Sequence, residues 1–280
     1  MAGMLYLCAT PIGNMGDMTS RVIKTLNEVD LIAAEDTRNS MKLLSAFDIH
    51  TPMTSYHEYN KVEKADQLIA KMQAGMNIAL ITDAGTPAIS DPGEVLVAKC
   101  QQAGIPVTSL PGPAACITAL TLSGLSTRRF CFEAFLPAEK KERKEILEEL
   151  QNESRTIILY EAPHHLVKTL TELSENLGDR RITLCRELTK KFETILPTTI
   201  SRALKKYETE EPRGEYVLVI EGKSREEKLK EQTKVWENMS IEEHMAFYEN
   251  SGMDNKAAMK QVAKDRGLGK RDVYEYLHKK

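Results

Sequence analysis

Residues 77–93 read NIALITDAGTPAISDPG, an apolar segment followed directly by a loop of small residues, prolines and aspartates. Asn77 to Thr82 has the length and composition of a buried strand, and Gly75 and Gly85 bound it. Glu94 to Gln102 then has the spacing of a helix. A strand, a loop and a helix in this order are typical of an α/β protein, in which ligands bind beyond the carboxyl ends of the strands.

The same alternation extends in both directions from this segment. Further strands are predicted at Leu5 to Cys8, Leu31 to Ala34, Met53 to Tyr56, Val107 to Leu110, Phe130 to Phe135, Thr156 to Tyr160, Ile182 to Cys185, Phe192 to Leu196 and Tyr216 to Ile220. The helices predicted between them are Thr19 to Asn27, Asp36 to Ala46, Lys61 to Gln73, Ala114 to Ser123, Lys140 to Gln151, His165 to Leu177 and Ile200 to Tyr207. The pattern predicts two α/β domains, at residues 1–123 and 124–223.

Residues 224–280 have a different character, and they predict a small helical extension. Lys256 to Arg266 and Arg271 to Leu277 read as two helices joined by a glycine-containing turn, a pattern typical of helix-turn-helix motifs. The apolar core shared by these helices is predicted to consist of Ala258, Val262, Leu268, Val273 and Leu277.

The same extension is basic, whereas the rest of the chain is acidic. Eight Lys and Arg residues stand against four Asp and Glu residues in 254–280, although the whole protein carries a net charge of −3. Any contact with nucleic acid is therefore expected to be local. The predicted RNA contacts are Lys256, Lys260, Lys264, Lys270 and Arg271. The alternative is a solvated helical cap for a dimer.

The composition excludes several classes of protein. No apolar run approaches the roughly 20 residues that span a bilayer, and the first residues do not resemble a signal peptide, so a cytoplasmic protein without membrane contact is expected. The five cysteines form no CxxC pair and read as reduced core thiols. The sequence contains neither a phosphate-binding GxxxxGK motif nor GxGxxG. No metal site is predicted, and a nucleoside triphosphate or NAD is disfavoured.

Three loops follow predicted strands directly and are rich in small residues and proline: Ala9 to Asn14, Asp83 to Gly93 and Pro111 to Ala115. Small side chains allow a ligand to approach the backbone, and prolines fix the shape of a loop before binding. The three loops fall at the same end of the first predicted sheet. Ordinary turns are the alternative for each loop alone, but together they predict a small-molecule site.

Eight segments then occur in an order typical of one known family. They are LYLCATPIGN, DLIAAEDTR, SYHEYN, ITDAGTPAISDPG, LPGPAA, ILYEAPHHL, CRELTKKFE and RGEYVLVIEG. The set spans Leu5 to Gly222 and resembles the 16S rRNA (cytidine-2′-O)-methyltransferase I family of the tetrapyrrole methylase superfamily. The tail resembles the C-terminal helix-turn-helix extension of that family.

The resemblance implies a class III methyltransferase fold, with S-adenosylmethionine bound in the cleft between two α/β domains. It also implies a homodimer without metal, which methylates the 2′-hydroxyl of a decoding-region cytidine in 16S rRNA, within the small ribosomal subunit. The cofactor-binding residues that the resemblance implies are Pro11, Asp83, Ala84, Gly85, Thr86, Ala114, Ala115, Tyr160, Ala162 and Gly214. For Asp83 the alternative is a side chain that only stabilises its own loop.

The candidate catalytic residues follow two other predicted strands. Glu35, Asp36 and Arg38 lie at the same end of the sheet as the three loops. One of the carboxylates is a candidate acceptor of the hydroxyl proton, and Arg38 is a candidate phosphate ligand. Alternatively, Asp36 caps the following helix and pairs with Arg38. For His57 the resemblance favours a role on the substrate side, and a structural role is the alternative.

Two other functions compete with this interpretation. The first is a methyltransferase of the same superfamily that acts on a tetrapyrrole or a modified histidine side chain. Such an enzyme would share the cofactor but would not need a basic tail. A non-catalytic RNA-binding assembly protein would share the tail but would tolerate larger side chains in the three loops. Cofactor binding separates the second alternative from the enzymes, and the choice of substrate separates the first.

Overall fold

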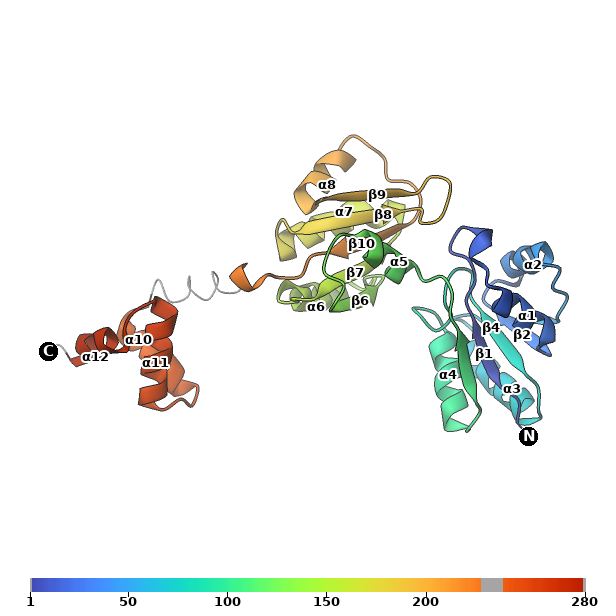
Figure 1. Ribbon diagram of the computed structural model, residues 1–280, viewed down its shortest axis with the longest axis horizontal. Coiled ribbons are helices and arrows are strands. Elements are labelled where there is room, and N and C mark those ends of the chain that lie inside the picture. Colours follow the sequence, from blue (N-terminus) through green and yellow to red (C-terminus); the bar gives the residue numbers. More distant parts are fainter. Residues whose placement is uncertain (1, 228–238, 279–280) are drawn as a thin grey trace. The chain divides into compact units, whose positions relative to one another are not determined.

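The computed structural model describes residues 2–227 and 239–278 (Figure 1). The chain divides into two compact units, one comprising Met1–Gln151 with Arg155–Glu221, and the other Asn152–Ser154 with Gly222–Lys280. The first unit contains two five-stranded sheets and the helices that cover them, and the second contains the C-terminal helices. The candidate functional site lies wholly in the first unit.

The first sheet is parallel throughout and has the strand order β3-β2-β4-β1-β5. Its strands are β1 (Leu5–Cys8), β2 (Leu31–Ala34), β3 (Met53–Ser55), β4 (Ile78–Ile81) and β5 (Val107–Leu110). The connecting helices are α1 (Ser20–Glu28), α2 (Thr37–Ala46), α3 (Lys61–Gln73) and α4 (Gly93–Gln102), and a short 3-10 turn, η1 (Met15–Asp17), follows β1.

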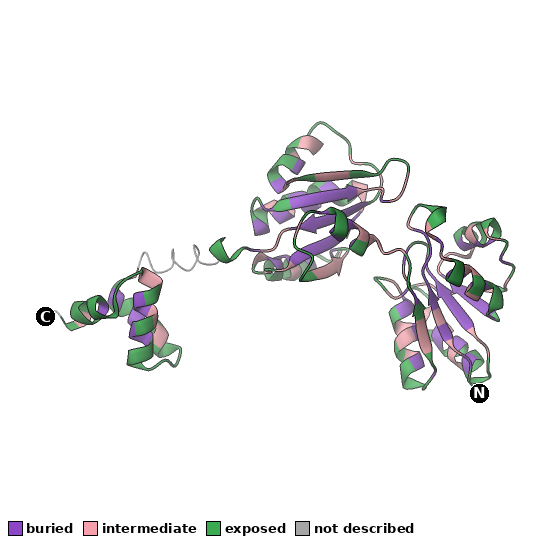
Figure 2. Cartoon of the chain, in the orientation of Figure 1, coloured by how far each residue is buried: buried purple, intermediate pink, exposed green. Residues whose placement is uncertain are grey.

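Helices cover both faces of this sheet, which explains why its central strands are continuously apolar. Side chains of α3 and α4 pack on one face, among them Leu68 and Leu96. Side chains of α1 and α2 pack on the other face, among them Leu26 and Leu44. β2 and β4 are buried along their whole length (Figure 2). The carboxyl ends of all five strands meet at one edge, where the loops rich in small residues follow.

The second sheet is mixed and has the strand order β6-β7-β10-β8-β9. Its strands are β6 (Phe130–Ala134), β7 (Thr156–Glu161), β8 (Arg181–Arg186), β9 (Thr194–Thr199) and β10 (Tyr216–Ile220). β6 and β7 are parallel, whereas β10 runs antiparallel to both β7 and β8. The helices α6 (Lys140–Gln151), α7 (Pro163–Leu177) and α8 (Ile200–Tyr207) share one apolar core with this sheet.

The other face of the second sheet packs against α5 (Ala115–Leu122), the helix that follows the last strand of the first sheet. Cys116, Ala119 and Leu120 of α5 form one buried cluster with Ile158 of β7 and Val217 of β10. The chain therefore enters the core of the second sheet before residue 123. The division into domains at 1–123, 124–223 and 224–280 stays a prediction.

The C-terminal unit contains α10 (Ile241–Asn250), α11 (Asn255–Arg266) and α12 (Lys270–His278). Gly267 ends α11 in the left-handed conformation that glycine adopts without strain. Ile241, Met245, Ala258, Val262 and Val273 are buried between the three helices. The predicted core was wrong at one position, because Leu268 in the turn is 41% exposed.

Most predicted elements match the structure to within two residues, and β9 is the main exception. The predicted strand over Phe192 to Leu196 was placed too early, because Phe192 is exposed in the loop before β9. β9 continues through Pro197, which a strand at the edge of a sheet tolerates because its free side needs no N–H donor. In the part of the chain that the structure describes, none of the helices is both long and apolar enough to cross a membrane.

Candidate active site

A cavity of about 600 Å³ lies at the carboxyl ends of the strands of the first sheet and is also lined by residues of the second sheet. Its first wall comes from Ile12 after β1, Glu35 after β2 and residues 82–86 after β4. Its second wall comes from Phe135 after β6, residues 160–163 at the end of β7 and the start of β10. Cys185 in β8 and Glu187, Leu188 and Lys190 after it complete this wall. A cavity of this size accommodates one small-molecule cofactor.

The loops after β1, β4 and β5 are joined to one another by hydrogen bonds from backbone N–H groups and threonine hydroxyls. Thr10 and Gly85 exchange two of them, with N···O distances of 2.9 and 3.1 Å, and the Thr10 hydroxyl donates to the carbonyl of Thr82 at 3.0 Å. The Thr86 hydroxyl donates to the carbonyl of Pro113 at 2.9 Å. These bonds fix the three loops relative to one another, so that their small residues form one continuous wall.

The loop after β4 also contains unusual backbone conformations. Ala88 and Ser90 have positive φ angles of 67° and 63°, which residues other than glycine rarely adopt. The Asp91 carboxylate accepts hydrogen bonds from the backbone N–H groups of Ala88, Ile89 and Gly93, which stabilises the turn. Strained backbone held in this way is typical of ligand-binding loops. Ile89, Ser90 and Asp91 all line the cavity.

Gly112 allows the third loop to approach the first. A Cβ atom at position 112 would lie 2.6 Å from the Cβ of Ala9, closer than carbon atoms can pack. We expect Gly112→Ala to separate the two loops and to weaken binding of S-adenosylmethionine, the cofactor that the resemblance implies, by roughly tenfold, equivalent to about 1.4 kcal/mol, measured by titration calorimetry. Gly16→Ala is the matched control, because Gly16 has no positive φ and a Cβ there would meet only the side chain of Asn14, at 3.2 Å. Equal affinities of the two variants would contradict the steric argument.

Six carboxylates and one ammonium line the cavity. The carboxylates belong to Glu35, Asp83, Asp91, Glu161, Glu187 and Glu215, and the ammonium belongs to Lys190. Lys190 donates to both Glu187 and Glu215, at 3.1 and 2.6 Å. The excess of negative charge favours a ligand that carries positive charge.

Glu187 is held in place by the loop before β10. Burial alone would raise the pKa of Glu187, but the backbone N–H of Glu215 and the Lys190 ammonium donate to its carboxylate and hold that pKa below its usual value. Gly214 makes this approach possible, because a Cβ there would lie 2.6 Å from the Cγ of Glu187 and its φ is +76°. The carboxylate therefore stays ionised beside the cavity.

Glu35 is the candidate catalytic carboxylate that lines the cavity. Its Oε2 atom accepts a hydrogen bond from the Thr82 hydroxyl at 2.9 Å. Asp36 begins α2 instead: its carboxylate accepts from the backbone N–H of Arg38 at 2.8 Å and pairs with the guanidinium at 3.1 Å. The hydrogen bond from the Arg38 side chain lowers the pKa of Asp36. Neither Asp36 nor Arg38 lines the cavity.

Asp83 connects the cavity wall to the start of α2. Its carboxylate accepts from the backbone N–H of Asp36 at 3.3 Å and from the side-chain amide of Asn39 at 3.4 Å. His57 does not line the cavity, and its backbone N–H donates to Asn60 at 2.8 Å. The Nδ1 atom of His57 is buried and has no hydrogen-bond partner among the described residues.

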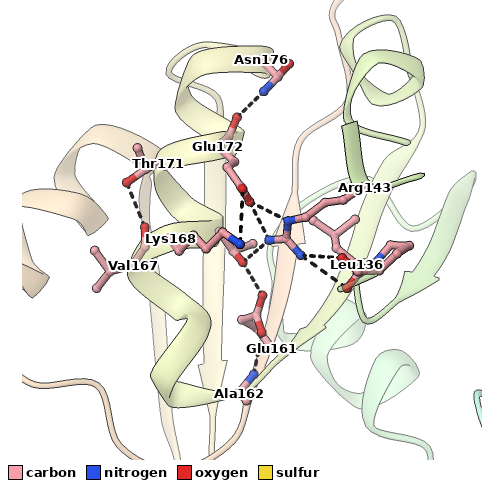
Figure 3. Close-up of polar contacts among 11 residues, drawn as sticks. Leu136, Arg143, Glu161, Ala162, Val167, Lys168, Thr171, Glu172 and Asn176 are labelled. Atoms are coloured by element: carbon pink, nitrogen blue, oxygen red, sulfur yellow. Dashed lines mark hydrogen bonds and ion pairs between the residues drawn. The ribbon is translucent and has the colours of Figure 1, made fainter. Parts of the chain in front are cut away.

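The end of β7 is fixed from two sides. The Tyr160 hydroxyl accepts from the backbone N–H of Cys116 in the first turn of α5, at 3.2 Å. The Glu161 carboxylate accepts hydrogen bonds from the backbone N–H of Ala162 and from the Thr169 hydroxyl. Thr169 in turn accepts from Arg143 at 2.7 Å, and Arg143 also donates to Glu172 (Figure 3). A buried polar network therefore positions Tyr160, Glu161 and Ala162 at the cavity.

Eight of the ten predicted cofactor-binding residues line the cavity: Asp83, Ala84, Gly85, Thr86, Ala114, Ala115, Tyr160 and Ala162. Pro11 and Gly214 do not line it, although their neighbours Ile12 and Glu215 do. Phe135 and Lys190 also line it and were not predicted.

The cysteines lie mainly in the core. Cys8, Cys100, Cys116 and Cys185 are buried, and burial raises the pKa of Cys8 to about 12 and that of Cys100 to about 11. Thiols with a raised pKa are poor nucleophiles and poor metal ligands. Among residues 2–227 and 239–278, no group of three or more His, Cys, Asp and Glu side chains is placed to hold a metal ion.

Structural comparison places this architecture among known methyltransferases. The chain superposes on a diphthine synthase with a TM-score of 0.63 at 12% identity, covering 78% of this chain and 90% of that one. It superposes on the uroporphyrin-III-C-methyltransferase from Thermus thermophilus with a TM-score of 0.55 at 18% identity, covering 78% and 94%. At these identities the likeness shows the fold alone, and it confirms the predicted class III methyltransferase fold.

Sequence comparison identifies the family. The family model of Tetrapyrrole (Corrin/Porphyrin) Methylases matches residues 4–204. The chain is 46% identical to the ribosomal RNA small subunit methyltransferase I of Bacillus subtilis, over 99% of this chain and 94% of that protein. It is 51% identical to the protein of the same name from Haemophilus influenzae, over 80% of each chain. The predicted resemblance is confirmed: the chain belongs to the ribosomal RNA small subunit methyltransferase I family, within the tetrapyrrole methylases.

Proposed function

We propose that this protein transfers a methyl group from S-adenosylmethionine to the 2′-hydroxyl of a cytidine in the decoding region of 16S rRNA, within the small ribosomal subunit. The name of its relatives supports ribosomal RNA as the substrate. The observation that carries the proposal is a cavity with walls of small residues and an excess of carboxylates, at the carboxyl ends of the strands. The cytidine, the ribose hydroxyl and the decoding region follow from the resemblance.

The residues around the cavity fit S-adenosylmethionine. The small side chains of Ala84, Gly85, Ala114, Ala115 and Ala162 allow the adenosine and methionine parts to approach the backbone closely. The sulfonium and the ammonium of the cofactor are cationic, which matches the excess of acidic residues in the lining. When bound, S-adenosylmethionine supplies an activated methyl group that a nucleophile can accept directly.

The chain's own contribution is to orient the nucleophile and to accept its proton. Glu35 is our candidate for the group that accepts the proton of the 2′-hydroxyl, because its carboxylate lines the cavity and the Thr82 hydroxyl fixes its direction. Asp36 is the second candidate. Arg38 is exposed at the start of α2, where it can bind a phosphate of the RNA backbone when it leaves Asp36. His57 remains a candidate on the substrate side.

The assembly and the location of the protein are further parts of this proposal. We infer a homodimer in the cytoplasm from the family resemblance. Sedimentation equilibrium on the full chain tests the dimer: a single species at the monomer mass, at the concentrations used for methylation, would exclude it.

The proposal is tested by transfer of labelled methyl groups to three substrates side by side: purified small ribosomal subunits, free 16S rRNA and a tetrapyrrole precursor. Label in rRNA at a single cytidine, with a nuclease-resistant linkage, is the expected result. Label only in the tetrapyrrole would retain the enzyme class and refute the substrate. Binding of RNA without binding of S-adenosylmethionine would favour a non-catalytic assembly protein.

We propose that the C-terminal unit contacts the RNA through Lys256, Lys260, Lys264, Lys270 and Arg271. All five side chains are exposed, on α11 and α12, and Arg271 pairs with Glu275 at 2.8 Å. Each lysine that neutralises a phosphate contributes about 0.7 to 0.9 to the slope of log affinity against log salt. Substituting the four lysines with glutamine should therefore flatten that slope, measured by filter binding of 16S rRNA.

The matched control replaces Lys140, Lys141 and Lys144 of α6, which are equally exposed in the first unit. These substitutions should leave the salt slope unchanged, and both variants should bind S-adenosylmethionine as the wild type does. An unchanged slope in the variant with four substituted lysines would contradict RNA binding by the C-terminal unit.

A further inference from the structure

The end of β6 is irregular, directly before Phe135, which lines the cavity. Along β6, Cys131 packs on the face of the sheet covered by α6 and α7, and Phe132 packs on the face covered by α5. Successive residues of a regular strand alternate between the two faces. A regular strand would therefore place residue 134 on the α5 face and residue 135 in the core on the opposite face.

A β-bulge changes this alternation. Phe132 pairs with Ile158 and Ala134 pairs with Leu159, so that β6 contains one extra residue where β7 advances by a single residue. Leu159 belongs to the core beneath α6 and α7, as does Leu136. The extra residue shifts the pattern by one, and Phe135 comes to the same face as Tyr160.

The bulge carries a conformational cost. Ala134 has a φ of +51°, a conformation that an alanine adopts only at a cost in free energy. The shift does not bury Phe135, which is 57% exposed. A bulge and a strained residue that together expose a large apolar ring are typical of positions where a side chain is directed at a ligand.

The ring of Phe135 is part of a small aromatic cluster. Its centroid lies 5.6 Å from that of Tyr160 at an interplanar angle of 63°, and Phe132 contacts Tyr160 from another side at 4.9 Å and 68°. Tyr160 is immobilised through its hydroxyl by Cys116. The edge contact leaves a face of the Phe135 ring available, and Phe135 and Tyr160 both line the cavity.

We propose that Phe135 forms an aromatic shelf on which a nucleobase stacks at the cavity. This inference rests on the proposed function, since both the cofactor and the RNA substrate then bring a nucleobase: the adenine of S-adenosylmethionine and the base of the target nucleotide. Every base has a π face, and stacking on an exposed aromatic ring contributes substantially to binding. A target nucleotide must in addition leave its stack to reach a cavity, and an aromatic ring replaces the lost stacking.

The test uses the full-length protein with Phe135→Leu, which keeps the apolar side chain and removes the ring, and Phe135→Trp, which keeps an aromatic face. Phe192→Leu is the matched control, because Phe192 is 66% exposed and does not line the cavity. Two quantities are measured: the Kd of S-adenosylmethionine without RNA, and the KM for small ribosomal subunits at saturating cofactor.

We expect Phe135→Leu to raise one of these constants by about tenfold, Phe135→Trp to restore it, and Phe192→Leu to leave both unchanged. A higher Kd identifies the stacked base as the adenine of the cofactor. A higher KM with an unchanged Kd identifies it as the base of the target nucleotide. The shelf is refuted if both constants stay at the wild-type value, or if Phe135→Trp is as defective as Phe135→Leu.

A failure of the proposed function gives a different result. If the wild-type enzyme transfers no methyl group to rRNA, the proposed substrate is wrong, and the Kd alone then tests the shelf. An unchanged Kd in Phe135→Leu would refute the shelf in that case as well. If the wild-type enzyme is active and Phe135→Leu matches it, the proposed function stands and only the shelf is refuted.

Discussion

We expect Glu35→Gln to lower kcat for methyl transfer by roughly 10²- to 10³-fold, the range usual for loss of a general base. The substitution keeps the shape of the side chain and leaves the Thr82 hydroxyl an oxygen to which it can donate. It removes the negative charge and, with it, the ability to accept a proton from the ribose hydroxyl. The Kd of S-adenosylmethionine should change by less than threefold, because one of several carboxylates around the cavity is neutralised. Steady-state methylation at saturating concentrations of small ribosomal subunits measures kcat, and calorimetry measures the Kd.

Asp36→Asn is the control that separates the two candidate carboxylates. Asp36 lies outside the cavity lining and caps α2. Asparagine caps a helix about as well as aspartate, so the substitution should cost little stability and change kcat little. A large fall in kcat for Asp36→Asn, together with near-normal turnover for Glu35→Gln, would transfer the role of the base to Asp36. If both variants keep wild-type turnover, neither carboxylate accepts the proton.

The sequence predicts those parts of the fold that depend on local pattern. The strand at Leu31–Ala34 has the bounds that its apolar run predicted, and the helix at Lys61–Gln73 has the bounds that its helical spacing predicted. The position of β10 between β7 and β8 was not predicted, because the pairing of distant strands leaves no signal in either segment. β9 was placed too early because the exposed Phe192 resembles a strand residue in composition.

The same distinction applies to the site. Loops of small residues after strands indicated Asp83 to Thr86 and Ala114 to Ala115, which line the cavity, because a ligand that approaches the backbone excludes large side chains locally. Phe135 was missed because its direction depends on a bulge and on the positive φ of Ala134, which no local composition indicates. Lys190 was missed because its place is determined by Glu187 and by Glu215, a residue 25 positions away.

We expect a large loss of folding stability when the buried polar network around Arg143 (Figure 3) is broken. Arg143 is only 8% exposed, and its guanidinium binds the Glu172 carboxylate at 2.6 Å and the Thr169 hydroxyl at 2.7 Å. The carbonyls of Leu136 and Pro137 accept from the same group at 3.4 Å. Arg143→Met fills the space but leaves these acceptors without their donor. Removing one partner from a buried pair costs about 3 kcal/mol of folding free energy, which urea unfolding followed by circular dichroism would detect.

Lys144→Met is the matched control, because Lys144 is the next residue of the same helix and its ion pair with Glu148, at 3.5 Å, is exposed. Pairs of this kind contribute about 0.5 kcal/mol or less. Arg143→Lys should fall between the two variants, since an ammonium cannot reach the acceptors as the planar guanidinium does. Equal stabilities of Arg143→Met and Lys144→Met would contradict a structural role for the network.

The network also predicts an effect on the site, because Thr169 joins Arg143 to Glu161, whose carboxylate accepts from the N–H of Ala162 at the cavity. Arg143→Met should therefore weaken S-adenosylmethionine binding several-fold under conditions where the protein remains folded, whereas Lys144→Met should not. A loss of stability without any change in cofactor affinity would mean that the network stabilises α6 and α7 but does not position the end of β7. Both measurements on the same variant thus separate a structural role from a positioning role.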